Sequence, residues 1–413
     1  MSLEQSFQKA FDKTKDNSPS FWKQKRIAAN EVFQSQGIPN NKNEEWKYTL
    51  LRSISDKVYN IESTVTLKDV ESKAIKGLEG FNLFFLNGKL INEVEGISVL
   101  SLDENPTILE KIASQKPYSI SEPFTSANFA ASDNGIVIEL SKSIDKPIVC
   151  NFISDASKDY SLALPQVFVH AKKGVEASFV VNYATIGDLD SFTNNQLSFY
   201  VEQNARISLA VIQHEAVNAS IVANTNVIQE RDSYFASTTV STQANIIRNS
   251  LAITSVGENT ESHMFGLYFL NGKTHVDNHT VIDHTQPNCF SNELFKGILD
   301  DNARGVFNGK VYVRQAAQKT NAFQSNKNIL LSDDATINTK PQLEIWADDV
   351  KCSHGATTGQ LDQQALFYLM ARGISKKKAI MLLLNAFSSE VIDKLGSDVL
   401  TDYVVDILSE RLT

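Results

Sequence analysis

The chain has 413 residues, 42% of them hydrophobic, and a formal net charge of −9 at pH 7. This composition is typical of a globular protein with a sizeable core and excludes a disordered chain. The acidic balance argues against a general nucleic-acid binder, which needs a basic face to displace counterions from phosphates. We expect no membrane segment and a cytoplasmic location. Apolar runs such as IMLLLNAF from Ile380 are shorter than the roughly 18 to 20 residues of a membrane helix, and the opening MSLEQSFQKAFDKTKD lacks the apolar stretch of a signal peptide.

The pattern predicts a mostly helical region over residues 1–80. Within it, residues 18–39 have the spacing of an amphipathic helix that Ser18 caps and Gly37 ends. The next motif, NEEWKYT, has an acidic pair ahead of aromatic residues. It predicts either a second helix start or a loop whose aromatic side chains pack onto the protein.

An αβ section over residues 81–155 leads into a core over residues 156–357 that is rich in short strands. The strand-like runs include QVFVHA, ASFVVNYA, QLSFYVE, RISLAVIQ, GVFNGKVYV and PQLEIWA, and the polar corners between such runs are KKGVEA, EQNARI, ERDSYF, GENTES, DDNARG and SDDATI. The corners are mostly about 27 to 32 residues apart, with one wider gap, which suits successive coils of a β-solenoid. A β-sandwich is the competing all-β interpretation, and the scarcity of hairpin signals at short, regular intervals favours the solenoid.

Residues 358–413 turn helical again. Three helices are predicted there: LDQQALFYLMAR, which ends at Gly373, KKKAIMLLLNAF, which Ser375 caps, and DVLTDYVVDILSERL, which Ser397 caps. Their combined apolar faces are large for so small a bundle. We therefore expect part of this region to pack on the solenoid or on a partner.

The chain has three cysteines and seven histidines, and Cys352 and His354 lie close together after the strand-like LEIWADDV. If that strand continues, both side chains point to one face and Ser353 points to the other. Thiolate and imidazole suit iron, zinc or copper, and a thiolate also carries sulfur. Two ligands do not complete a tetrahedral site, so a metal-binding version needs ligands from elsewhere, such as another subunit. The alternative is a buried thiol beside a surface histidine, and the wide spacing of Cys150, Cys289 and Cys352 predicts free thiols in either case.

A second group of candidate ligands lies in THVDNHTVIDH. A strand there places His275, Asp277 and His279 on one face, with His284 just beyond, which matches a two-histidine, one-carboxylate metal site in residue type only. A solvated or hydrogen-bonded ladder is the more common use of such a row. The sequence has no GxxxxGK[ST] motif, so we expect this chain not to hydrolyse nucleotides itself.

Three stretches carry a resemblance to a known family: NEEWKYT, VFNGKVYVRQAAQKTNAFQSNKNILLSDDATINTKPQLEIWADDVKC and CSHGATTGQLDQQALFYLMARGI. They are similar to the SufB/SufD family of the SUF iron–sulfur cluster assembly system, and the resemblance spans nearly the whole chain. The CSHGAT string is of the SufD type, whereas SufB-type chains are usually longer and carry an EHEAxT-type string at this position. A SufB-type scaffold paralogue is therefore the alternative.

The resemblance implies a mainly β fold, with a right-handed parallel β-helix core flanked by N-terminal and C-terminal α-helical regions. It implies a non-catalytic scaffold subunit that pairs with SufB through the β-helix cores and binds the ATPase SufC through residues 358–413. By motif position, His354 corresponds to a histidine at the SufB interface implicated in cluster formation, and Cys352 is its nearby thiol, so these two are the catalytic and metal-binding candidates. The implied cofactors are a transient iron–sulfur cluster shared with SufB, ATP bound by SufC rather than by this chain, and a flavin associated with the complex.

The resemblance also leads to expectations about contacts. SufC binding is expected through apolar positions of the C-terminal helices, namely Phe367, Leu383, Leu384 and Phe387. The isolated chain is expected to form a homodimer through the β-helix edge that otherwise meets SufB. The competing function classes are a β-helix enzyme that acts on polysaccharide and a homodimeric metal-storage protein or metalloenzyme.

Overall fold

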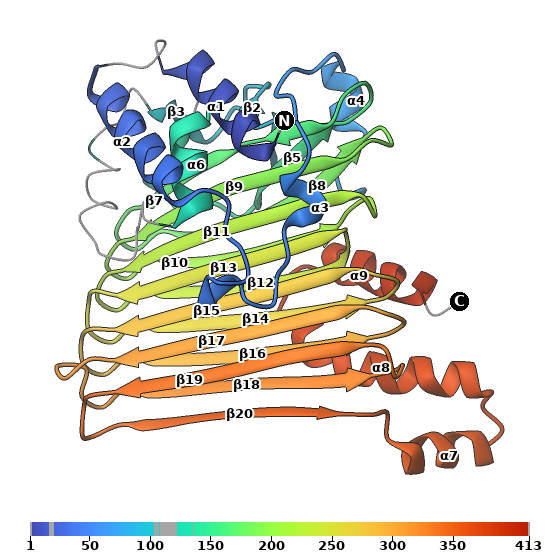
Figure 1. The fold of residues 1–413 in the computed structure, drawn as a ribbon. Helices are drawn as coiled ribbons and strands as arrows, with labels where there is room; N and C mark the ends of the chain where they lie inside the picture. Colours follow the sequence, from blue (N-terminus) through green and yellow to red (C-terminus); the bar gives the residue numbers. More distant parts are fainter. Residues whose placement is uncertain (1, 16–19, 103–106, 108–121, 134, 412–413) are drawn as a thin grey trace.

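The computed structural model describes the chain except for residues 1, 16–19, 103–106, 108–121, 134 and 412–413. The expected cap at Ser18 lies outside the described residues. Within the described part of the chain, no helix is both long and apolar enough to cross a bilayer. A long stack of strands dominates the molecule, with helices against its first coils and beside its last ones (Figure 1).

Two sheets that face each other form the stack. Sheet A contains β3 (Ser98–Ser101), β4 (Ile136–Leu140), β6 (Ser161–Ala163), β7 (Gln166–Ala171), β9 (Ser191–Val201), β11 (Ala219–Gln229), β13 (Ile246–Ser255), β15 (His275–His284), β17 (Arg304–Val313) and β19 (Thr336–Ile345). Sheet B contains β1 (Phe81–Leu86), β2 (Lys89–Leu90), β5 (Ile148–Asp155), β8 (Glu176–Ile186), β10 (Arg206–His214), β12 (Tyr234–Gln243), β14 (Glu261–Leu270), β16 (Phe290–Leu299), β18 (Asn321–Leu330) and β20 (Lys351–Gly359). From β7 to β20 consecutive strands alternate between the two sheets, and each strand pairs in parallel with the next strand of its own sheet. Each coil therefore adds one strand to each sheet. The predicted parallel β-helix with helical regions at both ends is confirmed, and the β-sandwich alternative is wrong.

The coils stack in register with a repeat of roughly 30 residues. One row of paired positions in sheet B consists of Arg206, Tyr234, Glu261, Phe290, Asn321 and Lys351. At corners from sheet A to sheet B one residue adopts a left-handed backbone conformation, with φ of 60° at Asn204, 58° at Asp232 and 57° at Asn259, which Asn and Asp accept more readily than most residues. The wider gap in the predicted corner series arises because DDNARG and SDDATI lie at the opposite corner, where the chain returns from sheet B to sheet A.

The core of the solenoid lies between the two sheets. Inward-facing side chains of both sheets fill it. Among them, the ring of Phe199 lies between those of Phe179 and Phe235, with centroid distances of 5.2 Å to Phe179 and 5.3 Å to Phe235. Burying a phenylalanine side chain contributes roughly 1.5 to 3 kcal/mol. Because each coil buries its apolar face against the next, neighbouring coils stabilise one another.

Most of the N-terminal helical region covers the outer face of sheet A at the first coils. Its elements are α1 (Leu3–Thr14), α2 (Ser20–Gln36), the 3₁₀ turn η1 (Glu44–Trp46), α3 (Arg52–Ser55) and α4 (Leu67–Glu71), joined by α6 (Pro123–Ala131) from further along the chain. Phe7, Trp22 and Phe124 of these helices pack with Phe168 and Phe192 of sheet A in one apolar cluster. Helix α4 is the exception, because its Val70 packs against Phe84 and Ile153 of sheet B. After α2 the chain descends across sheet A before it turns back towards the first coils (Figure 1).

The C-terminal region consists of α7 (Gln363–Ala371), α8 (Lys376–Ile392) and α9 (Asp398–Arg411). Helices α8 and α9 pack on the outer face of sheet B, where Val404 belongs to the same buried cluster as Phe265 and Leu267. Lys296 of sheet B reinforces this contact, because its ammonium group pairs with Glu390 at 2.6 Å. Helix α7 lies beyond the end of β20 (Figure 1). The expectation that these helices dock in part on the solenoid is therefore confirmed.

Candidate functional site

The last coil of the solenoid has open edges within the described chain. Strand β20 is the terminal strand of sheet B and β19 is the terminal strand of sheet A, and each pairs with a neighbour on one side only. Most residues of β20 are exposed. A strand edge of this kind presents unpaired backbone N–H and C=O groups that can pair with another chain. We call this end of the molecule the open end.

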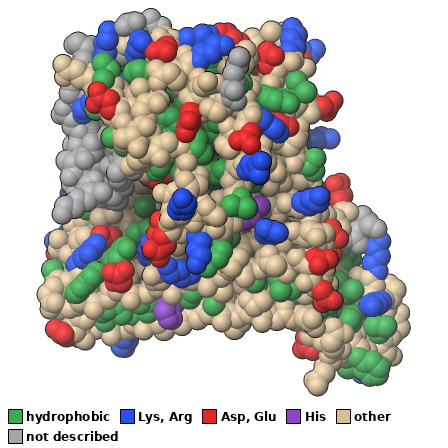
Figure 2. Space-filling model, viewed as in Figure 1, with side chains coloured by type: hydrophobic (Ala, Val, Ile, Leu, Met, Phe, Trp, Pro, Cys, Tyr) green, Lys and Arg blue, Asp and Glu red, His purple; other side chains and the backbone are tan. Residues whose placement is uncertain are grey.

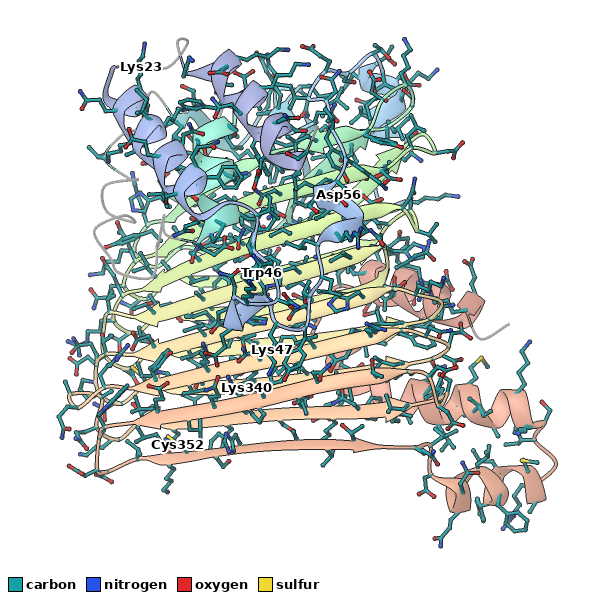
Figure 3. All side chains as sticks on the ribbon, in the orientation of Figure 1. Lys23, Trp46, Lys47, Asp56, Lys340 and Cys352 are labelled. Carbon is teal, nitrogen blue, oxygen red and sulfur yellow. The ribbon has the colours of Figure 1, made fainter. Side chains whose placement is uncertain are left out.

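Cys352 and His354 lie on β20 at the open end, where Figure 3 labels Cys352. The register pairs Cys352 with Ala322 and His354 with Gln324. Ala322 and Gln324 are buried between the sheets, and paired residues of parallel strands point to the same face. The side chains of Cys352 and His354 therefore share the inward face, while Ser353 points outward, as the alternation predicted.

The two candidate ligands differ in their surroundings. Cys352 is half-buried against an apolar cluster that includes Val311, Val313 and Ala347. Burial raises the pKa of its thiol, against a backbone hydrogen bond with Ala322 that lowers it, so the thiol is held in its protonated form. His354 is exposed at the rim of the coil.

This pair alone does not make a complete metal site. Among the described residues, no group of three or more His, Cys, Asp and Glu side chains is arranged to hold a metal ion. The open end leaves room for ligands from a second chain, because β20 has no neighbouring strand on its outer side in the described part of the chain and His354 is exposed there. All three cysteines are free thiols, as predicted.

The second predicted ligand group has another use. His275, Asp277 and His279 lie on the outer face of sheet A, where residues 43–50 cross it, and we call residues 43–50 the strap. His279 bonds to Asp277 at 3.0 Å and to Glu45 of the strap at 3.2 Å. Thr49 of the strap contacts His275 at 2.9 Å and donates a hydrogen bond to Asp277. These side chains form a hydrogen-bonded ladder that fastens the strap, so the metal-site interpretation has no support in the geometry.

The strap is also held by cations of sheet A. Arg248 forms a buried ion pair with Asp277. Its guanidinium also donates a hydrogen bond to the carbonyl of Glu45 at 2.8 Å and lies 4.3 Å from the centroid of the Trp46 ring. Figure 3 shows Trp46 and Lys47 above the middle of the sheet, with Lys340 on a strand nearer the open end. In Figure 2, acidic and basic side chains gather on this part of the surface. Of the alternatives open for NEEWKYT, the loop with a short 3₁₀ turn is the one observed, and it packs through Trp46, whereas the expected packing of Tyr48 is wrong because that ring is 45% exposed.

The residues expected to contact SufC fall into two groups. Leu384 is 2% exposed and belongs to the cluster that holds α8 on sheet B, and Leu383 and Phe387 are partly buried against the same cluster. Phe367 of α7 is 73% exposed. Its neighbours Tyr368 and Met370 are exposed as well, and sequence patterning missed them because a short amphipathic helix does not show which of its apolar positions find partners. In Figure 2 apolar side chains gather at the corner where α7 lies.

Fold and site together define a class of protein: a two-sheet β-solenoid with helical regions at both ends and an incomplete thiol–imidazole pair at its open end. Residues 152–387 match the family model described as SUF system FeS cluster assembly, SufBD core domain. Residues 1–146 match the model of the SufBD protein N-terminal region. The chain belongs to the SufBD family, and its function lies in iron–sulfur cluster assembly.

Similar proteins come from bacteria and plants. The chain is 28% identical over 385 residues to the iron–sulfur cluster assembly protein SufD of Escherichia coli, which covers 91% of this chain and 90% of that protein. It is 29% identical over 393 residues to a SufBD family protein of Synechocystis, with 90% and 87% covered. It is 33% identical over 268 residues to the chloroplastic protein ABCI7 of Arabidopsis thaliana, with 63% and 56% covered.

Proposed function

We propose that this chain is a SufD-type scaffold subunit of the SUF complex, which pairs with SufB through the open end and binds the ATPase SufC through its C-terminal helices. The observation that carries the proposal is the Cys352–His354 pair on the inward face of an uncovered coil. The pair supplies two ligands of the kind that iron and its clusters take. A partner that extends the sheets past β20 would bring its own ligands to the same place.

The SufD-type assignment is favoured over a SufB-type scaffold by the CSHGAT string at residues 352–357. It is also supported by the similarity to the E. coli SufD, which extends over 91% of this chain. In this role the chain is not the source of chemical energy. ATP is bound by SufC, and this chain supports iron acquisition and cluster assembly.

The two site residues have different roles in the proposal. The His354 imidazole ligates iron or accepts a proton at the rim of the open end, where it is exposed. Cys352 is the secondary residue, because its half-buried thiol must lose a proton against a raised pKa before it binds metal. The iron–sulfur cluster is the product that the complex assembles and holds transiently between the two subunits, and the proposal includes a flavin bound to the complex.

Helix α7 is the proposed SufC contact. Phe367 and Tyr368 are 73% and 58% exposed, although large apolar side chains are usually buried. Leu384 holds α8 in place and does not reach the surface. The proposed contact surface therefore consists of α7 together with the exposed edge of α8 at Leu382.

Copurification tests the proposal. An affinity-tagged full-length chain, recovered from an extract of its own cells and analysed by mass spectrometry, is expected to bring down SufB and SufC in fixed ratio. Recovery of the chain with neither protein would contradict the proposal. Stoichiometric iron in the chain purified alone would instead favour the metal-storage alternative.

A further inference from the structure

A column of polar side chains leads inward from His354. The register of sheet B pairs Glu293 of β16 with Gln324 of β18, and Gln324 with His354 of β20. All three are on the inward face, in successive coils. Glu293 and Gln324 are 1% and 3% exposed, and both are buried between the sheets near the rings of Phe295 and Phe307.

The side chain of Gln324 is held in one orientation by its neighbours. Its amide nitrogen donates to Glu293 Oε2 at 2.6 Å, and Thr280 from the facing sheet donates to the other carboxyl oxygen. Gly309 of sheet A leaves the space that the amide fills, since a Cβ at that position would lie 2.3 Å from Gln324 Nε2. The amide nitrogen is therefore directed at Glu293, away from β20.

This orientation leaves the amide oxygen as a buried acceptor. Gln324 Oε1 has no hydrogen-bond partner among the described residues. A buried acceptor without a partner costs about 1 to 3 kcal/mol. The neighbouring inward side chain on the uncovered side is His354, and an imidazole N–H is a suitable donor.

The described position of the exposed His354 ring does not make this bond. We infer that Gln324 is the positioning residue for His354: the ring rotates on β20 so that one nitrogen donates its hydrogen to Gln324 Oε1, which leaves the other nitrogen as a free lone pair directed at the open end. Histidines that bind metals are generally fixed in this way, by a hydrogen bond from the second ring nitrogen to a carbonyl or carboxylate. Glu293, Thr280 and Gly309 act one step further back, because they fix the amide. The inference rests on the proposed role of His354, and it adds the residues that set which nitrogen is available.

The tautomer of His354 tests the contact. The full-length chain, labelled with ¹⁵N only at its seven histidines, is studied by long-range N–H correlation NMR at about pH 9, where imidazoles are generally neutral, and His354→Ala identifies the signal. A single neutral tautomer is expected in the unsubstituted chain, and exchange between both tautomers is expected in Gln324→Met. A signal in Gln324→Met that is identical to that of the unsubstituted chain would overturn the inference.

Asn326→Leu is the matched control. Asn326 is a second buried, inward amide on β18, but its partner on β20 is Ala356, so this variant should leave the His354 tautomer unchanged. If Gln324→Met does not fold, Gln324→Asn keeps the amide but withdraws it by one methylene, and it is expected to give the same exchange between tautomers. Retention of the single tautomer in Gln324→Asn would equally overturn the inference.

Cluster assembly by the reconstituted complex supplies the second readout. Gln324→Met is expected to lower the assembly rate about 10-fold or more, in the range seen when a metal ligand loses its supporting hydrogen bond, whereas Asn326→Leu should not. An unchanged rate in Gln324→Met, with the tautomer disturbed, would overturn the positioning role. If His354→Ala also assembled clusters normally, the proposed function of His354 would fail, while the tautomer result would still report on the contact itself.

Discussion

At the scale of single residues, Cys352 and His354 share a face but not an environment. The thiol packs against the last apolar layer of the solenoid, and the imidazole stands at the rim. A side chain that is exposed and makes few contacts contributes little to stability, so a strong effect of its removal must come from function. Substitution of His354 therefore separates the two interpretations of this pair.

We predict that His354→Ala impairs cluster assembly and leaves the fold intact. Stability should fall by about 1 kcal/mol, the net contribution of the single hydrogen bond inferred between His354 and Gln324. Complementation of a strain that lacks the native protein, under iron limitation, measures the first effect, and a thermal melt of the purified variant measures the second. Full complementation would remove His354 from the mechanism, and a large fall in melting temperature would make the residue structural.

Glu293 makes the stability of the fold depend on pH. Burial raises the pKa of this carboxyl to about 7, against hydrogen bonds from the uncharged Thr280 and Gln324. The unfolded value is about 4.3. The protonated carboxyl therefore stabilises the fold fully below about pH 4.3, and this contribution is lost as the pH rises through about 7.

We predict that Glu293→Gln flattens this decline. Between about pH 5 and pH 8 the unsubstituted chain should lose on the order of 2 to 3 kcal/mol of unfolding free energy that the variant keeps. Urea unfolding at a series of pH values measures the difference. Burial also raises the pKa of Glu215 to about 7, so some pH dependence of stability should remain in both proteins. Parallel curves of unfolding free energy against pH for the two proteins would show that Glu293 is charged throughout.

At the scale of elements, the strap is an N-terminal segment held by ion pairs on sheet A. Burial by itself would raise the pKa of Asp277, but the adjacent Arg248 guanidinium and His279 hold it well below its usual range. A hydrogen bond with His279, aided by Lys310, lowers the pKa of Glu45 to about 2 against the effect of burial. The strap is therefore fixed by carboxylates that stay charged, and the stability they contribute is lost only as the pH falls through these lowered values.

We predict that Arg248→Met destabilises the protein by about 3 kcal/mol, because it leaves the Asp277 carboxylate buried without its main cation. The double variant Arg248→Met/Asp277→Asn should be more stable than Arg248→Met alone, since the uncompensated charge is gone. Urea midpoints of the two variants and the unsubstituted chain give the comparison. Equal losses in the single and double variants would mean that the buried charge is not the cause.

The C-terminal helices serve both the fold and a partner. Because α8 and α9 cover Phe265, Leu267 and Phe269 of sheet B, deletion of everything after residue 360 would uncover an apolar sheet face. Such a truncation does not test SufC binding cleanly. Point substitutions on α7 avoid the problem, since its outer face makes few contacts with the rest of the chain.

We predict that Phe367→Ser combined with Tyr368→Ser weakens SufC binding at least 10-fold, as expected when exposed aromatic anchors of an interface are removed. The melting temperature should stay within a degree or two of the unsubstituted value. Titration of labelled SufC gives the affinity. Val217→Ser is the control, because Val217 is 71% exposed on a loop of the solenoid. Comparable weakening of SufC binding by this control would show that the effect is not specific to α7.

At the scale of the whole molecule, the two ends of the solenoid differ. The N-terminal helices cover the first coils, whereas β19 and β20 leave the last coil open (Figure 1). An open edge tends to pair, and a symmetric dimer is the simplest closed arrangement. The same surface would then serve self-association in isolation and SufB pairing in the complex.

We predict that the isolated chain is a homodimer that SufB dissociates. Sedimentation should show a dimer at micromolar concentration, and hydrogen exchange should slow on dimerisation in β19 and β20 but not in β10. Addition of SufB should convert the dimer to a heterodimer with the same strands protected. A monomer at all concentrations would show that the chain does not self-associate. Protection confined to α7 would show that the dimer forms through α7 and not through the open end.

The sequence by itself determined the features that follow from local spacing. Corner residues recurring at the coil length predict a solenoid, cap residues predict the C-terminal helices, and strand alternation places Cys352 and His354 on one face. The same spacing contains the polar column, since Glu293, Gln324 and His354 follow one another at the coil repeat. The residue types conceal this column in the sequence, because Glu and Gln are ordinary surface residues in most strands.

Only the tertiary structure decided which faces meet. Thr49 contacts His275 across 226 positions of the chain, which turns a row of candidate metal ligands into the anchor of the strap. Leu384 lies inside and Phe367 outside, although both occupy apolar helical positions. The physical reason is that sequence periodicity shows only which side of a helix or strand is apolar. Which segment covers that side depends on how distant parts of the chain pack together, and this packing is decided by the apolar surface that the whole chain buries.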